Sequence, residues 1–250
     1  MTLEEFFAEQ PRVAIAFSGG VDSAYLLYAA KQYAREVGAY YVKTSFQPCF
    51  ELEDALRLAR EIGVKLRVIC LDVLSDENVR INPPERCYHC KRRLFEAIAD
   101  RAAKDGFTVL IDGTNASDDE GDRPGMRALS ELAVLSPLRL CGLTKAEVRL
   151  LSKEAGLFTW DKPAYACLAT RVQTGRAIER RLLFRTEHAE GFMAGLGFRS
   201  FRVRTVGEGA KIQLAASQFR LFEEKRGLIF ERLLEDYSAV TVDPVPRDEN

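Results

Sequence analysis

An apolar run that ends in a pair of glycines most constrains what this chain can fold into. Val13-Ala14-Ile15-Ala16-Phe17 leads directly into Ser18-Gly19-Gly20-Val21-Asp22-Ser23, and Leu26, Leu27 and Ala30 then recur at helical spacing. This pattern predicts a buried strand, a tight loop and the start of a helix. The two glycines allow the backbone of the loop to approach an anion without a Cβ in the way.

The predicted loop carries the groups that a phosphate needs. Free N–H groups at a helix start, together with the helix dipole, attract phosphate. Ser18 and Ser23 can add hydroxyl donors, and Asp22 can hold a magnesium ion that bridges phosphate oxygens. An ordinary glycine turn capped by serine is the alternative, but the full S-G-G-x-D-S string after a buried strand favours a nucleotide site.

The loop lacks the G-K-[ST] ending of a Walker P-loop. It resembles instead the PP-loop of the ATP pyrophosphatase superfamily. This resemblance implies that the protein binds ATP with Mg²⁺ and cleaves it between the α- and β-phosphates. It also implies that AMP is attached to a substrate oxygen, which makes that oxygen part of a leaving group.

Composition and charge narrow the class of protein. With 250 residues, the chain can form one large domain or a medium domain and a small one. Its net charge of −1 provides no overall field toward nucleic acid or membrane, so we expect neither as a partner. No apolar run is long enough to cross a bilayer, and the acidic Met1–Glu5 segment is not a signal peptide. We therefore expect a cytoplasmic protein with reduced cysteines.

Strand and helix patterns alternate in the first part of the chain. Strands are predicted at 40–44, 66–71 and 109–111, and helices at 51–62, 90–103 and 145–155. Thr144 and Glu147 have the spacing of a capping box and open the last of these helices. The alternation predicts an α/β fold with a doubly wound parallel sheet, in which ligands bind at the carboxyl ends of the strands.

From about residue 173 the pattern changes to that of a small α+β domain. Helices are predicted at 177–196 and 217–234, and strands at 201–206, 211–215 and 239–242. We therefore predict two domains, a PP-loop domain over residues 1–172 and a small α+β domain over residues 173–250.

Three cysteines are candidates for sulfur or metal chemistry. Cys87 and Cys90 form a C-x-x-C before a predicted helix, which is compatible with a redox pair, half of a zinc site or two ligands of an iron–sulfur cluster. No second C-x-x-C completes a zinc ribbon. Cys167 is the candidate third thiolate, because it lies in a proline-containing loop where a thiolate could face the active-site crevice. Three thiolates leave one metal position open, as a catalytic site needs. Incidental roles for these thiols are the alternative. The other cysteines are expected to act as small apolar residues: Cys49, Cys70 and Cys141.

Over nearly its whole length the sequence resembles the LarE family of PP-loop enzymes. These are ATP-dependent sulfurtransferases that build the nickel-pincer nucleotide cofactor of lactate racemase. Besides S-G-G-V-D-S, the similarity rests on N-P-P-x-R-C-Y-x-C-K at 82–91, D-G-T-N at 112–115, D-R-P-G at 122–125, A-C-L-A-[ST]-R at 166–171 and F-R-V-R at 201–204.

The family has two forms. In one, a lone cysteine gives up its own sulfur and becomes dehydroalanine. In the other, three cysteines hold a 4Fe–4S cluster whose remaining iron carries an extra sulfide for transfer. This chain has Cys87 and Cys90, and Cys167 lies one place after the sacrificial position, which is Ala166 here. The sequence is therefore similar to the cluster form, which implies repeated turnover with an external sulfide donor.

The resemblance also implies a reaction. The substrate is a small-molecule nucleotide, a pyridinium dicarboxylate mononucleotide, and the protein is a homo-oligomer. A substrate carboxylate attacks the α-phosphorus of ATP, pyrophosphate leaves, and a sulfur nucleophile displaces AMP from the acyl-adenylate. The residues that this assigns to ATP and Mg²⁺ are Ser18, Gly19, Gly20, Asp22, Ser23, Asp112 and Gly113.

Basic residues are assigned to the substrate. The resemblance gives Lys91 a catalytic role in binding phosphate or the substrate carboxylate. It implies that Arg171, Arg202 and Arg204 bind the phosphate and carboxylate groups of the substrate, which suit the forked donors of arginine. An exposed surface position is the alternative for each arginine. A further basic stripe is interpreted as a solvated face rather than a phosphate site: Arg176, Arg180, Arg181 and Arg185.

Three other functions remain open from the residues alone. A PP-loop enzyme that thiolates tRNA is compatible with the C-x-x-C, but the net charge and the lack of an obvious RNA-binding module argue against it. An amidating PP-loop synthetase needs an ammonia source and gives no reason for three cysteines. A zinc-stabilised module that binds nucleotide without catalysis is the third alternative.

Overall fold

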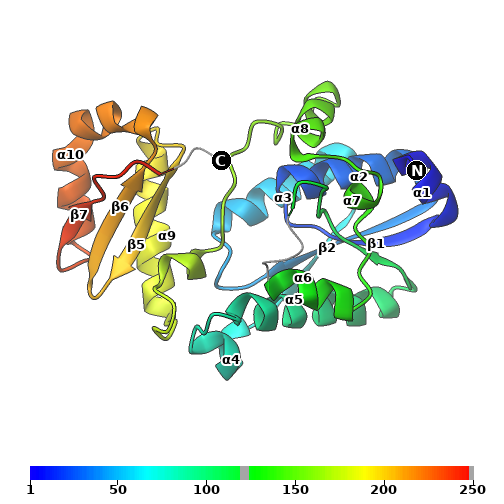
Figure 1. Cartoon of the computed structure of the whole chain (residues 1–250), viewed down its shortest axis with the longest axis horizontal. Helices are drawn as coiled ribbons and strands as arrows, with labels where there is room; N and C mark the ends of the chain where they lie inside the picture. Colours follow the sequence, from blue (N-terminus) through cyan, green and yellow to red (C-terminus); the bar gives the residue numbers. More distant parts are fainter. Residues whose placement is uncertain (119–123, 248–250) are drawn as a thin grey trace. The chain divides into compact units, whose positions relative to one another are not determined.

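The computed structural model describes residues 1–118 and 124–247, and the chain divides into two compact units (Figure 1). The first unit comprises Met1–Val73 and Glu85–Lys162, and the second comprises Leu74–Pro84 and Pro163–Asn250. Of the D-R-P-G block, residues 122 and 123 lie outside the described residues.

A parallel sheet forms the centre of the first unit. Within the described residues it has four strands, in the order β3-β2-β1-β4. Their bounds are Arg12–Ala16 for β1, Glu36–Lys43 for β2, Leu66–Cys70 for β3 and Leu110–Ile111 for β4. The chain passes from β1 to β2 and β3 and then returns to β4 on the other side of β1. In such sheets ligands bind at the carboxyl ends of the strands beside this reversal.

Helices cover both faces of this sheet (Figure 1). Because successive side chains of a strand point to opposite faces, Val13 and Ile15 of β1 pack in one apolar cluster with Leu26, while Ala14 packs in another with Ile98. The doubly wound α/β prediction is confirmed. The helices of the unit are α1 (Leu3–Glu9), α2 (Val21–Tyr33), α3 (Cys49–Ile62), α5 (Arg86–Lys104), α6 (Pro124–Glu131), α7 (Pro137–Leu140) and α8 (Lys145–Glu154).

The second unit has its own small sheet and its own core. Strand β5 (Phe201–Val206) pairs antiparallel with β6 (Gly209–Leu214), which pairs parallel with β7 (Val240–Val242). Apolar residues of these strands pack with residues of two long helices, for example Val203 with Met193 and Phe222. The helices of the unit are α4 (Glu77–Arg80), α9 (Arg180–Gly195) and α10 (Phe219–Leu234).

The limits of the second unit differ from the predicted boundary at residue 172. The unit takes in Leu74–Pro84 and the segment 163–172, both of which the sequence patterns placed in the first domain. The side-chain amide of Asn82 donates to the carbonyl oxygens of Val172 and Gln173, at 3.4 and 2.9 Å. The backbone N–H of Ile178 also donates to Arg80 O at 2.8 Å. These contacts join segments about 90 residues apart, which no local pattern signals.

In the two described ranges, no helix is both long enough and apolar enough to cross a bilayer.

Candidate functional site

The loop between β1 and α2 forms the first part of the candidate site. Gly19 has a φ of +76°, a left-handed conformation that favours glycine. A Cβ at this position would lie only 3.1 Å from the Cβ of Ala55 in α3. Gly20 is the N-cap residue of α2 and has no side chain to bond the helix start. The backbone therefore turns tightly at the amino end of a 13-residue helix.

Two hydroxyl groups close this loop. The Oγ atoms of Ser18 and Ser23 lie 3.0 Å apart. Ser23 Oγ donates to the carbonyl of Gly20 at 3.1 Å and accepts from the N–H of Ser18 at 3.3 Å. The structure thus brings the predicted residues Ser18, Gly19, Gly20 and Ser23 together in one turn. N–H and O–H groups gathered at a helix start are suited to bind phosphate oxygens.

The loop that follows β4 contacts the start of α2. A Cβ at Gly113 would lie 2.8 Å from the backbone nitrogen of Ser23, so this close approach requires glycine. Asp112 is buried and accepts hydrogen bonds from the hydroxyls of Thr114 and Ser136, each at 2.6 Å. Gly113 therefore lies directly against the turn after β1, and the hydrogen bonds of Asp112 hold the loop that carries it.

Among the described residues, Asp22 has two side-chain partners. Its Oδ1 accepts from the amide of Asn115 at 3.2 Å, and its Oδ2 forms an ion pair with Nζ of Lys145 at 2.5 Å. Asn115 belongs to the D-G-T-N block, whereas Lys145 was not predicted as a site residue. The only sequence signal for Lys145 was its position directly after the Thr144 helix cap.

The oxygen donors at this turn fit magnesium. Mg²⁺ is commonly bound through one or two carboxylates together with substrate phosphate oxygens. Asp22 supplies a carboxylate beside the hydroxyl of Ser23 and beside the turn where phosphates are expected. Asp22, bridging to nucleotide phosphates, is therefore a suitable magnesium ligand.

The C-x-x-C lies on a helix. Cys87 and Cys90 are in the first two turns of α5, and Nη2 of Arg86 donates to Sγ of Cys87 at 3.3 Å. The neighbouring Lys91 packs its side chain against Gly125 of α6, where a Cβ would lie 2.7 Å from Cδ of the lysine.

The third candidate cysteine, Cys167, belongs to the second unit. Among the described residues, no group of three or more His, Cys, Asp or Glu side chains is arranged to hold a metal ion. The three-cysteine iron–sulfur cluster is therefore not supported by a metal-binding group in the described residues.

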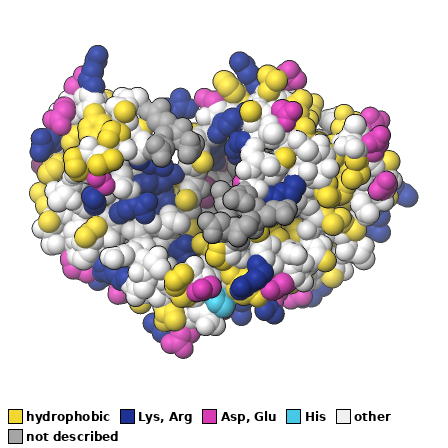
Figure 2. Space-filling model, viewed as in Figure 1, with side chains coloured by type: hydrophobic (Ala, Val, Ile, Leu, Met, Phe, Trp, Pro, Cys, Tyr) yellow, Lys and Arg dark blue, Asp and Glu magenta, His cyan; other side chains and the backbone are white. Residues whose placement is uncertain are grey.

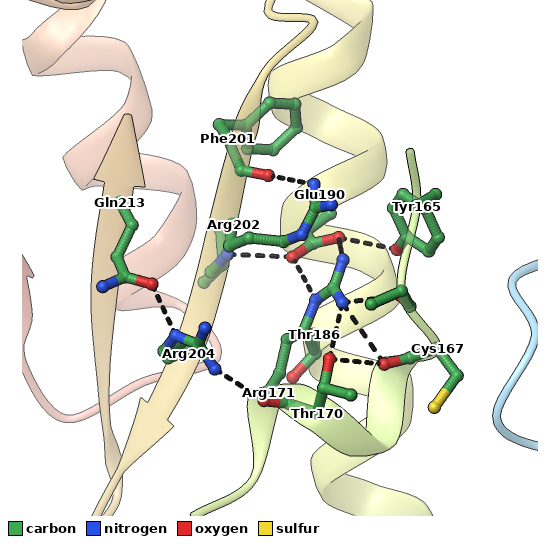
Figure 3. A network of polar contacts seen from close by, with 12 residues as sticks. Tyr165, Cys167, Thr170, Arg171, Thr186, Glu190, Phe201, Arg202, Arg204 and Gln213 are labelled. Carbon is green, nitrogen blue, oxygen red and sulfur yellow. Dashed lines mark hydrogen bonds and ion pairs between the residues drawn. The ribbon is translucent and has the colours of Figure 1, made fainter. Parts of the chain in front are cut away.

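A buried ion pair organises the polar network of the second unit (Figure 3). Arg171, only 1% exposed, donates from Nε and Nη2 to the two carboxylate oxygens of Glu190 at 2.9 and 3.0 Å. Glu190 also accepts from the hydroxyl of Tyr165 and the N–H of Val203. Burial by itself would lower the pKa of Arg171, but the hydrogen bonds and the charge of Glu190 raise it.

Arg171 also fixes the loop that carries Cys167. Its Nη1 donates to the carbonyl oxygens of Ala166 and Cys167 at 2.6 and 3.2 Å, and to Oγ1 of Thr170 at 2.8 Å. Figure 3 shows the guanidinium between Glu190 and this loop. The side chain that the family resemblance assigned to substrate thus has its contacts within the protein.

Arg202 and Arg204 add positive charge beside this pair. Arg202, 8% exposed, donates to the carbonyls of Phe201 and Ala164, and burial together with the charges of Arg171 and Arg247 lowers its pKa to about 10. The same causes lower the pKa of Arg204. Burial is the largest cause of both shifts, and the charges of Arg171 and Arg247 add to it; a bound anion would offset the contribution of these charges. Figure 2 shows Lys and Arg side chains gathered over the β5–β6 part of this unit.

The basic stripe, which begins before α9 and continues into its first turns, differs from a purely solvated face. Glu208, in the turn between β5 and β6, accepts from Arg176, Arg181 and Arg185 at 3.1, 3.1 and 3.0 Å. The Arg185 side chain is only 7% exposed and lies over the ring of Tyr237. These arginines tie the helix region to the β5–β6 turn.

Comparison with curated proteins finds relatives along most of the chain. An uncharacterised protein of Synechocystis sp. is 36% identical over 222 residues, which cover 88% of this chain and 82% of the relative. The pyridinium-3,5-bisthiocarboxylic acid mononucleotide synthase of Lactiplantibacillus plantarum is 31% identical over 229 residues, which cover 90% and 83% of the two chains. No model of a protein family matches the sequence.

A second group of relatives is more distant. The tRNA-specific 2-thiouridylase MnmA of Thermotoga maritima is 27% identical over 194 residues, which cover 60% of this chain and 54% of the relative. The named relatives in both groups are sulfur-transferring enzymes, which supports an enzyme of this class.

Proposed function

The chain belongs to the LarE family, that of the Lactiplantibacillus plantarum pyridinium-3,5-bisthiocarboxylic acid mononucleotide synthase. From this membership we propose that the protein is an ATP-dependent sulfurtransferase that converts a carboxylate of a pyridinium dicarboxylate mononucleotide into a thiocarboxylate. One observation carries the proposal. The S-G-G-V-D-S turn lies at the carboxyl end of β1, next to the loop after β4, and has the donors and the carboxylate that a magnesium nucleotide requires.

In the proposed first step, a carboxylate oxygen of the substrate attacks the α-phosphorus of ATP. The bond from this phosphorus to the oxygen bridging to the β-phosphate breaks, pyrophosphate leaves and an acyl-adenylate forms. The N–H groups of the turn and the hydroxyls of Ser18 and Ser23 hold phosphate oxygens, and Lys91 binds phosphate or the substrate carboxylate. Donors fixed before the reaction stabilise the charge that develops on the leaving group. Magnesium on Asp22 would neutralise phosphate charge when bound.

In the proposed second step, a sulfur nucleophile attacks the acyl carbon and AMP leaves with its electron pair. The positive charges of Arg171 and Arg247 beside Arg202 and Arg204 support a role of these two arginines in binding the substrate's phosphate or carboxylate groups. Arg171 acts as a positioning residue, because its contacts hold Glu190 and the backbone of the Cys167 loop. We also propose an external sulfide donor and a homo-oligomer, which the family implies.

The fate of sulfur is tested by product analysis. Purified anaerobically, the protein is incubated with ATP, Mg²⁺, sulfide and the pyridinium dicarboxylate mononucleotide. Mass spectrometry is expected to show a product in which one oxygen has been exchanged for sulfur. If the protein cleaves ATP in this reaction but the product contains no sulfur, the proposal is overturned.

The 4Fe–4S cluster on Cys87, Cys90 and Cys167 stays a prediction from the sequence. If it is correct, Cys87→Ala, Cys90→Ala and Cys167→Ala each abolish sulfur transfer while substrate-dependent pyrophosphate release persists. Cys70→Ala is the matched control, because Cys70 is an exposed cysteine at the end of β3. This variant is expected to retain both activities.

Iron and sulfide analysis of the same proteins gives the second readout. Wild-type protein with about four irons per chain agrees with a 4Fe–4S centre. Repeated turnover in any one of the three variants, or iron-free wild-type protein with full activity, would contradict the three-ligand prediction.

A tRNA-thiolating activity is the alternative that the MnmA relatives favour. The two functions are separated in a strain that lacks the gene. Loss of the nickel-pincer cofactor with normal tRNA 2-thiolation agrees with the main proposal. Loss of tRNA 2-thiolation with the cofactor unaffected would replace it.

A further inference from the structure

The ion pair between Lys145 and Asp22 joins two parts of the first unit that are 123 residues apart. Asp22 is the second residue of α2 and lies at the phosphate-binding turn, whereas Lys145 is the first residue of α8. The Lys145 side chain is 36% exposed and the Asp22 side chain 21%, so the pair is accessible to solvent and ligands. The residue assigned to magnesium therefore already has a cationic partner.

The backbone of Lys145 is held firmly while its side chain is not enclosed. Thr144 and Glu147 form a reciprocal capping box at the start of α8. The N–H of Lys145 donates to Oγ of Ser117 at 3.0 Å, which ties α8 to the loop that follows β4. Val148 of α8 shares the apolar cluster of α2. The position of the lysine is thus fixed, and only its flexible four-carbon side chain can change partner.

Charge determines what this side chain does when a nucleotide arrives. A divalent cation on Asp22 would stand close to the ammonium group of Lys145, and like charges at such distances repel. The triphosphate simultaneously brings several anionic oxygens to the same helix end. Lysine offers three donors on a compact charge, so phosphate oxygens are suitable replacement partners for Nζ.

We propose that Lys145 is a phosphate-binding residue of the nucleotide site. In the ligand-free protein it neutralises Asp22. When ATP and magnesium bind, it releases Asp22 to the metal and donates to oxygens of the phosphates that leave as pyrophosphate. This inference rests on the proposed ATP site and adds to it a residue that the sequence patterns did not assign.

The test measures equilibrium binding of the α,β-methylene analogue of ATP, which cannot be cleaved between those phosphates. Calorimetry with and without Mg²⁺ compares the wild type, Lys145→Met, Asp22→Asn and the double variant. We expect Lys145→Met to weaken binding by about 10- to 100-fold, the loss of one charge-assisted contact. We expect a similar loss when the same change is made in Asp22→Asn, because the contact is to phosphate.

The Asp22→Asn background separates the two roles of the lysine. If Lys145 serves only to neutralise Asp22, removing it from a protein that lacks this carboxylate changes nothing, and that result overturns the inference. Lys145→Arg keeps the charge and is expected to retain more affinity than Lys145→Met; equal loss in both would also count against a phosphate contact.

Lys153→Met is the matched control, since this lysine is on the same helix and lies over the ring of Trp160. It is expected to bind the analogue as the wild type does, and thermal unfolding checks that each variant is folded. Failure of the wild type to bind the analogue would refute the proposed ATP site itself. Normal wild-type binding with unaffected Lys145 variants would refute only this inference.

Discussion

The buried pair of Arg171 and Glu190 is the contact on which the polar network of the second unit depends. Each partner has further hydrogen bonds, from Tyr165 and Val203 to Glu190 and from Arg171 to the Cys167 loop. A charge removed from water is tolerated only when it is paired and hydrogen-bonded. Losing one partner would therefore leave an uncompensated charge in the interior.

Glu190→Ala is expected to destabilise the second unit by about 3–5 kcal/mol, the usual cost of breaking a buried pair. Glu224→Ala is the control, because its pair with Arg220 on α10 is exposed and is worth less than about 1 kcal/mol. Urea unfolding followed by circular dichroism measures both. Equal, small changes in the two variants would show that the buried pair does not stabilise this unit.

Single residues differ in how well the sequence reveals their roles. Ser18, Asp22 and Ser23 share one short string, so local spacing is enough to predict that they lie together. Lys145 reaches Asp22 only through the folding of α8 beside the loop after β4, and nothing near it in the sequence signals this contact. The burial of Arg171 was equally hidden, since arginine is usually exposed.

At the scale of helices and strands, hydrophobic periodicity predicts most of both units. The strands expected at 66–71 and 201–206 are observed as Leu66–Cys70 and Phe201–Val206. Helix α1 was not predicted, although Thr2 and Glu5 form a capping box that marks its start. Such caps carry a local signal even where the apolar pattern is short.

The position at which α5 begins determines whether the C-x-x-C lies on a helix or in a loop. The pattern predicted a helix from residue 90, but α5 begins at Arg86. The C-x-x-C therefore lies within the helix instead of the loop before it. Residues three apart on a helix face the same side, so Cys87 and Cys90 are neighbours on α5. The apolar pattern missed this turn because Arg86, Cys87 and His89 interrupt it.

At the scale of the whole molecule, the proposed site residues divide between the two units. The nucleotide turn, Cys87, Cys90 and Lys91 belong to the first unit, whereas Cys167 and the arginines at 171, 202 and 204 belong to the second. The sequence patterns could not show that Leu74–Pro84 joins the second unit. That membership depends on the amide of Asn82, which bonds carbonyls about 90 residues away.

The central claim is that the turn after β1 activates a substrate carboxylate by breaking the α–β bond of ATP. The most direct measurement is nucleotide analysis of the complete reaction with the wild type and Asp22→Ala. We predict AMP and pyrophosphate in equal amounts, formed only with the dicarboxylate substrate, and neither product from the variant. Formation of ADP and phosphate by the wild type, or pyrophosphate release by Asp22→Ala at the wild-type rate, would contradict the account.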